Sequence, residues 1–197
     1  MIKIGLTGSI AVGKSFVLDI FKIKYNIPVF SSDECVRKIY AENIELKKFI
    51  KEKILECDRK FTSEDIASIV FKDSAKLQIL ENFIHPLVKM EREEFVNQEF
   101  DKQSRLVVIE VPLLFEKNLE YEFDSIILVD VGEDIQEERA LLRKNMTREK
   151  YLSIKAKQIP NNEKIERCDF VINNHDEATT KDSVGKIVKE LNKQAGI

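Results

Sequence analysis

The stretch Gly8-Ser9-Ile10-Ala11-Val12-Gly13-Lys14-Ser15 decides the fold. It matches the phosphate-loop pattern G-x-x-x-x-G-K-[ST] at every position, and it lies between a strand pattern at residues 2–6 and a helical pattern at residues 15–21. Average residue usage gives a chance match in fewer than about one in a hundred chains of this length. The stretch therefore predicts a strand, a phosphate-binding loop and a helix in that order.

The chemistry of this loop indicates nucleotide binding. Gly8 and Gly13 permit the backbone angles that turn successive amide N–H groups inward, and the helix that begins near Gly13 adds the positive end of its dipole. Lys14 would place its charge between the β- and γ-phosphates of ATP, and the Ser15 hydroxyl would be a ligand of Mg²⁺. The alternative, an ordinary glycine-rich turn, is disfavoured because every element of the motif is in context. The predicted ATP-binding residues of this segment are Gly8, Ala11, Val12, Gly13, Lys14, Ser15 and Phe16.

Beyond the loop, buried strand patterns alternate with helical ones. The strand patterns lie at residues 28–30, 106–111, 125–129 and 170–172. Such alternation predicts an α/β fold whose parallel sheet is covered on both faces, with ligands beyond the carboxyl ends of the strands.

Residues 33–100 interrupt this alternation with a nearly all-helical pattern. Thr62 and Asp65 have the spacing of a capping box, and Pro86 is expected to bend or break the helix in which it lies. Residues 143–167, rich in Arg, Lys, Asn and Glu, are expected to form a mobile, charged excursion.

Length and composition set broader limits. At roughly 150 residues per domain, 197 residues allow one core with an insertion. Hydrophobic residues make up 43% and charged residues 34%, and no stretch is apolar enough to span a membrane, so a globular chain is expected. The net charge is 32 − 35 = −3, which provides no basic field for nucleic acid or an anionic membrane.

The amino end enters a strand pattern directly, without a basic and apolar leader, so a cytoplasmic location is expected. The three cysteines are far apart, form no C-x-x-C pair and fit reduced thiols better than disulfides or a zinc site.

Guanine-nucleotide signatures do not follow the loop. The string closest to N-K-x-D is 192–195, which ends in alanine, and no D-x-x-G turn follows the strand pattern at 107–110. The GTPase interpretation is therefore disfavoured.

A second candidate site lies at Ser31-Ser32-Asp33-Glu34, after the short strand pattern. Taken alone, the string favours a capping box from Ser31 to Glu34, with Asp33 as a first-turn acid stabilised by the helix dipole. A catalytic role for Asp33 is compatible with this capping role, because an ionised Asp33 over the sheet edge could accept a proton from a substrate hydroxyl.

Several strings together resemble the dephospho-CoA kinase family in order and spacing, over nearly the whole chain. The strings P-L-L-F-E and H-P are more specific to it than the phosphate loop. The matching strings are 5–8 with 13–15, Asp33, 67–71, His85-Pro86, 112–116, Gln136-x-x-Arg139, Gln158 with Lys164, and 169–174.

The resemblance implies ATP-dependent phosphorylation of the ribose 3′-hydroxyl of dephospho-CoA, the last step to coenzyme A, with Mg²⁺. It also implies the fold of nucleoside-monophosphate kinases, in which a parallel five-stranded sheet carries a helical substrate-binding insertion and a lid. The corresponding domains would be a nucleotide-binding core, a CoA-binding insertion and a lid. Their expected bounds are 1–32 with 101–142 and 168–197 for the core, 33–100 for the insertion and 143–167 for the lid. A monomer or weak homo-oligomer is expected.

Carried onto this chain, the resemblance implies roles for individual residues. The catalytic set would be Asp33 as base, Lys14 and Arg139. Further ATP contacts would be Arg139, Arg143 and Asn174, further substrate contacts would be His85, Pro112 and Leu113, and the Mg²⁺ ligands would be Ser15 and Glu110.

Structural roles remain open for some of these residues. Arg139 and Arg143 are four apart, so they could hold a phosphate between them or form a solvated helix face. His85 could be a hydrogen-bonded structural histidine, and Glu110 could be an ordinary acid at a strand end.

The chain departs from the family pattern at three positions. Ser31 and Phe16 stand where the family usually has Asp and Thr, and Ser63 stands where it often has Arg. Two other functions stay open beside the first: another nucleotide or small-molecule kinase of the same fold, and a nucleotide-sensing protein without transfer activity.

Overall fold

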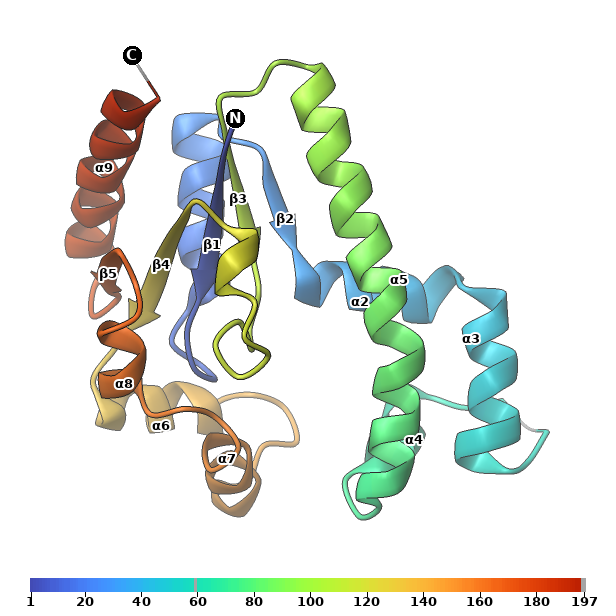
Figure 1. Ribbon diagram of the computed structural model, residues 1–197. Helices are drawn as coiled ribbons and strands as arrows, with labels where there is room; N and C mark the ends of the chain where they lie inside the picture. Colours follow the sequence, from blue (N-terminus) through green and yellow to red (C-terminus); the bar gives the residue numbers. More distant parts are fainter. Residues whose placement is uncertain (59, 196–197) are drawn as a thin grey trace. The chain divides into compact units, whose positions relative to one another are not determined.

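The computed structural model describes residues 1–58 and 60–195. In this part of the chain, five parallel strands form one sheet in the order β2-β3-β1-β4-β5 (Figure 1). This confirms the predicted parallel five-stranded sheet flanked by helices. The strands are β1 (Ile2–Thr7), β2 (Val29–Ser31), β3 (Leu106–Glu110), β4 (Ser125–Asp130) and β5 (Phe170–Asn173).

The three central strands are apolar because both faces of the sheet are covered. All five residues of β3 are buried. In the register, Leu6 of β1 pairs with Glu110 of β3 and with Ile127 of β4, so the carboxyl ends of these strands lie along one edge of the sheet. The phosphate loop leaves β1 at that edge.

One face of the sheet packs against the first and last helices of the chain. These are α1 (Lys14–Asp19), which continues as the π-helical turn η1 (Ile20–Lys24), and α9 (Glu177–Gln194). Their apolar side chains join those of the strands in one cluster, in which each fully buried aliphatic side chain contributes about 1.5–3 kcal/mol. Its fully buried members include Ile4, Leu6, Val17, Phe21, Val108, Ile127, Val129, Ile172, Val184 and Leu191.

Between β3 and β5 the chain forms four short helices. They are η3 (Glu120–Glu122), α6 (Glu133–Leu141), α7 (Arg148–Lys155) and α8 (Asn161–Ile165). Thr147 caps α7 by accepting a hydrogen bond from the Lys150 backbone N–H. The segment 143–167 therefore contains two helices, of which α7 has a side-chain cap and α8 has none.

The chain divides into two compact units. The sheet unit joins Met1–Ser31 to the chain from Gln98 onward, and the helical unit is Ser32–Asn97. The helical unit contains α2 (Ser32–Glu42), α3 (Ile44–Phe49), η2 (Ile50–Leu55), α4 (Ser63–Val70) and most of α5 (Ser74–Asp101). Residue 59 of the expected insertion and residues 196–197 of the expected core lie outside the described residues.

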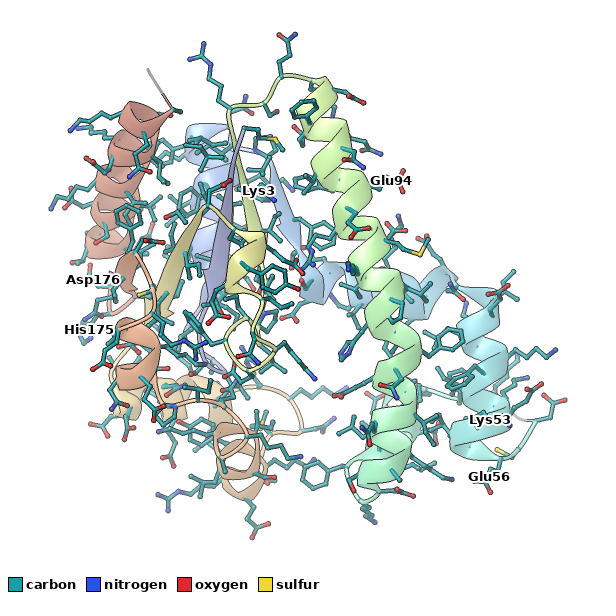
Figure 2. The ribbon with its side chains drawn as sticks, viewed as in Figure 1. Lys3, Lys53, Glu56, Glu94, His175 and Asp176 are labelled. Atoms are coloured by element: carbon teal, nitrogen blue, oxygen red, sulfur yellow. The ribbon has the colours of Figure 1, made fainter. Side chains whose placement is uncertain are left out.

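The helical unit has its own core and its own ties between helices. The rings of Phe49 and Phe83 stack at a centroid distance of 4.5 Å. The Lys76 ammonium donates to the Ile54 carbonyl oxygen at 2.9 Å and to the Glu56 carboxylate. Figure 2 labels Glu56 and Lys53 near the end of η2.

Of the two local features expected in this unit, the structure confirms the capping box and not a helix break. The capping box at the start of α4 is confirmed, since Thr62 and Asp65 exchange hydrogen bonds between side chain and backbone. Of the expected bend or break at Pro86, the break is wrong, because α5 is continuous through that residue to Asp101, and the bend stays a prediction. Pro86 and Asn82 are both exposed, so the carbonyl that loses its helical partner lies at the helix surface, where water can hydrogen-bond it.

Candidate active site

The phosphate loop connects β1 to α1 through a strained backbone. Gly8 and Gly13 have φ values of 152° and 89°, and Ala11 has φ of 62°. The left-handed region costs a non-glycine residue about 1–2 kcal/mol, so the surrounding structure must hold Ala11 in this conformation. Tyr151 of α7 and Ala140 of α6 pack against it.

The Lys14 side chain folds back over the loop. Its Nζ donates to the carbonyl oxygens of Gly8 at 2.9 Å and Ser9 at 3.2 Å. This places the ammonium at the loop, where phosphate oxygens would bind, and Ser15 is exposed at the start of α1.

Side chains from distant parts of the sheet unit hold the backbone of the loop. Gln136 donates to the Ile10 carbonyl oxygen at 2.7 Å, and Gln158 accepts from the Ile10 N–H at 3.0 Å. Asn174 donates to the Val12 carbonyl oxygen at 2.7 Å. Because each of these backbone groups has a side-chain partner, the loop keeps its shape without needing a nucleotide for those bonds.

Arg139 and Asn174 meet beside Gly13. Arg139 of α6 donates to the backbone carbonyl oxygens of Asn174 at 3.0 Å and His175 at 3.5 Å. A Cβ atom at Gly13 would lie 2.1 Å from Asn174 Nδ2 and 3.6 Å from Arg139. A guanidinium, a buried amide and the end of the phosphate loop therefore converge at one point.

The end of β3 carries a buried carboxylate. Glu110 has no exposed surface, and its Oε2 accepts a hydrogen bond of 2.5 Å from the Ser31 hydroxyl at the end of β2. Among the described residues, no three His, Cys, Asp or Glu side chains gather as a metal cluster. The Glu110 carboxylate and the Ser15 hydroxyl would suit Mg²⁺ bound with a nucleotide, because Mg²⁺ usually takes one or two protein ligands and completes its shell with phosphates and water.

A family model of dephospho-CoA kinase matches residues 2–180 of this chain. The chain belongs to the dephospho-CoA kinase family. That family comprises phosphotransferases that catalyse the final step of coenzyme A biosynthesis.

Two dephospho-CoA kinases agree with this membership, and one other kinase shares only the fold. The dephospho-CoA kinase of Bartonella quintana is 41% identical over 191 residues, covering 95% of this chain and 97% of the relative. The structure of dephospho-CoA kinase from Campylobacter jejuni has a TM-score of 0.70 at 28% identity and covers 98% of both chains. A shikimate kinase from Acinetobacter baumannii shares the fold, with a TM-score of 0.57 at 14% identity over 98% of this chain and 94% of that one.

The other residues expected from the family pattern lie in several places. Asp33, the second residue of α2, and His85 of α5 are exposed and belong to the helical unit. Pro112 and Leu113 are half-buried in the segment after β3, and Phe16 is exposed on α1. Arg143 is exposed and lies beyond the last residue of α6.

The N-terminus of α9, which follows β5, has an acidic cap. Asp176 caps α9, and hydrogen bonds from the Thr179 backbone N–H and hydroxyl lower the pKa of its carboxyl group. Figure 2 shows Asp176 and His175 in the turn between β5 and α9. Tyr151 of α7, which packs against Ala11 of the phosphate loop, is buried, and this burial raises the pKa of its hydroxyl group.

The family strings contain functional residues whose roles the linear pattern does not reveal. Gln136 and Gln158 belong to those strings, yet nothing in their spacing predicts that both hold Ile10. The family pattern predicts that Asn174 contacts ATP, and its buried side chain donates to the Val12 carbonyl oxygen and accepts from the Thr180 hydroxyl at 3.0 Å. Only the folded chain shows this clamp on the loop.

Replacing Gly13 by alanine is expected to destabilise the fold by about 1–3 kcal/mol and to weaken ATP binding. The new methyl group would displace Asn174 from the Val12 carbonyl oxygen, and the φ of 89° would strain alanine as well. Urea unfolding and calorimetric titration with ATP measure the two effects.

Gly132→Ala is the matched control, because a Cβ atom there meets nothing within 4 Å. Gly132 is the N-cap of α6, where alanine is less favourable than glycine, so Gly132→Ala should lose less stability than Gly13→Ala and keep wild-type ATP affinity. Equal unfolding midpoints for the two variants would contradict the close contact at Gly13.

Proposed function

We propose that the chain transfers the terminal phosphoryl group of ATP to the ribose 3′-hydroxyl of dephospho-CoA, giving coenzyme A and ADP. The observation that carries the proposal is the clamped phosphate loop at the edge of the sheet, in a chain of the dephospho-CoA kinase family. The loop supports ATP as the donor, and the family supports dephospho-CoA as the acceptor.

On the donor side, the proposed roles follow from charge and position. Phosphoryl transfer passes through a loose transition state, so the protein mainly orients the reactants and stabilises charge on the oxygens. Lys14 and the loop amides would bind the β- and γ-phosphates. Arg139 beside Gly13 would add a second positive charge on the nucleotide, while Arg143 and Asn174 remain proposed contacts.

On the acceptor side, Asp33 is the proposed general base. It follows the carboxyl end of β2 by two residues and is exposed in the first turn of α2. A carboxylate there would orient the attacking hydroxyl and accept its proton, a contribution of about 10²- to 10⁴-fold in rate. His85, Pro112 and Leu113 remain proposed substrate contacts, and the helical unit and the segment 143–167 remain the proposed CoA-binding insertion and lid.

Mg²⁺ is the proposed cofactor. The Ser15 hydroxyl and the Glu110 carboxylate would hold it, Glu110 directly or through water. When bound, the ion neutralises charge on the β- and γ-phosphates.

A cytoplasmic location is also proposed. No helix in the described residues is long and apolar enough to cross a bilayer. Cys35, Cys57 and Cys168 are all free, which suits a reducing compartment.

Product analysis after incubation with ATP, Mg²⁺ and dephospho-CoA tests the proposal. The expected result is stoichiometric ADP and coenzyme A, identified by mass spectrometry and ³¹P NMR. AMP, CMP and shikimate serve as competing acceptors under the same conditions. Faster turnover of any of these would show another kinase of this fold, and ATP binding without any phosphorylated product would show a nucleotide sensor.

A further inference from the structure

A buried ion pair contacts the phosphate loop. Lys164 of α8 has no exposed side-chain surface, and its Nζ lies 2.8 Å from Glu116 Oε1. The same Nζ lies 3.4 Å from the hydroxyl oxygen of Ser9, the second residue of the loop. The pair therefore joins the segment after β3, the helix α8 and the phosphate loop.

Further hydrogen bonds extend this contact. The Ser9 hydroxyl donates to Asn161 Oδ1 at 2.6 Å, and the Asn161 amide donates to Asp130 at the end of β4. Glu116 Oε1 also accepts from the Ile159 N–H at 2.9 Å. The Ser9 hydroxyl thus contacts two residues of the segment 158–164, which also supplies Gln158 to Ile10.

Because the pair is buried, a contribution to stability alone does not explain why it is present. Buried ion pairs usually add little net stability, because desolvation of both charges offsets their attraction. They are retained in some proteins because they specify one arrangement of the groups around them. Here the group next to the ammonium is part of the phosphate loop.

We propose that Lys164 is a positioning residue for phosphoryl transfer: with Glu116 as its counter-charge, it acts through Ser9 to hold the phosphate loop in the shape that binds ATP. This inference rests on the proposed function, since it concerns the loop that would bind the donor. It assigns to the segment 158–164 a task at the loop in addition to any task as a lid.

The double variant Lys164→Met/Glu116→Gln is the main test. It removes both charges, so neither partner is left buried and unpaired, which Lys164→Met alone would do. The dissociation constant of ATP, measured by calorimetry, should rise about tenfold or more, as expected for loss of a hydrogen bond to a charged group. The KM for dephospho-CoA should not change.

Lys155→Met/Glu133→Gln is the matched control. Like Lys164, Lys155 lies in the segment 143–167 and pairs at 2.8 Å, here with Glu133 of α6, but the side chains of this pair are 35% and 84% exposed instead of 0% and 11%. It should bind ATP like the wild type.

A double-mutant cycle with Ser9→Ala tests the path of the effect. If Lys164 acts through Ser9, the loss in ATP affinity from Lys164→Met/Glu116→Gln should largely disappear in the Ser9→Ala background. Additive losses would overturn the inference, and so would a lower unfolding temperature with unchanged ATP affinity in the folded protein. Absence of ATP binding by the wild type would overturn the proposed function as well. If the wild type is active and Lys164→Met/Glu116→Gln binds ATP with the same affinity, this inference alone is overturned.

Discussion

Lys14→Ala is expected to lower kcat/KM for ATP by about 10²- to 10³-fold, the loss seen when one preorganised donor to a developing anion is removed. The Lys14 ammonium lies at the loop, held by the carbonyl oxygens of Gly8 and Ser9. Both affinity and turnover should fall, because the charge acts on the phosphates in the ground state and in the transition state. Steady-state kinetics with varied ATP, together with calorimetric titration, separate the two contributions.

Lys22→Ala is a suitable control, since Lys22 is an exposed lysine of η1 a few residues further along the chain. It tests whether loss of any positive charge in this region has the same effect. Wild-type kinetics in Lys14→Ala would remove the phosphate loop from the mechanism.

Asp33→Asn is expected to reduce kcat by about 10²- to 10⁴-fold while ATP affinity stays the same. The change keeps the shape of the side chain and removes its capacity to accept a proton. Loss of a negative charge from the first turn of α2 costs only about 0.3–1 kcal/mol, so the fold should persist. Single-turnover measurements of coenzyme A formation, with ATP binding measured in parallel, report the two quantities.

Glu34→Gln controls for the general effect of charge at this helix end. Glu34 is the next residue, is also exposed, and pairs with Arg37 at 3.7 Å. We expect it to turn over dephospho-CoA like the wild type. If Asp33→Asn kept full turnover, Asp33 would not be the base.

Several features were predictable because they depend on neighbours along the chain. The strand, loop and helix around Gly8–Ser15 follow from local backbone requirements, and the alternation of residues 106–173 follows from the burial of both sheet faces. The capping box at Thr62 and Asp65 is a contact across three residues. Pro86 shows the limit of this reasoning, since its local effect depended on whether the freed carbonyl would lie at the helix surface.

The site itself was predictable in part. Motif and family pattern selected Lys14, Arg139 and Asn174, and the structure brings the last two together beside Gly13. The clamp on Val12 was not predictable, because a list of residues does not say which atoms of Asn174 are already engaged.

The linear order of residues was enough to establish a nucleotide loop, a parallel sheet and a family. It could not establish what surrounds that loop. Lys164 reaches Ser9 across 155 positions, and Gln158 reaches Ile10 across 148. Periodicity and spacing act over one or two turns of chain, whereas these partners meet because β4 pairs beside β1 and so carries the helices that follow it to the loop. The order of the strands in the sheet, and not any local sequence pattern, therefore determines which residues contact the phosphate loop.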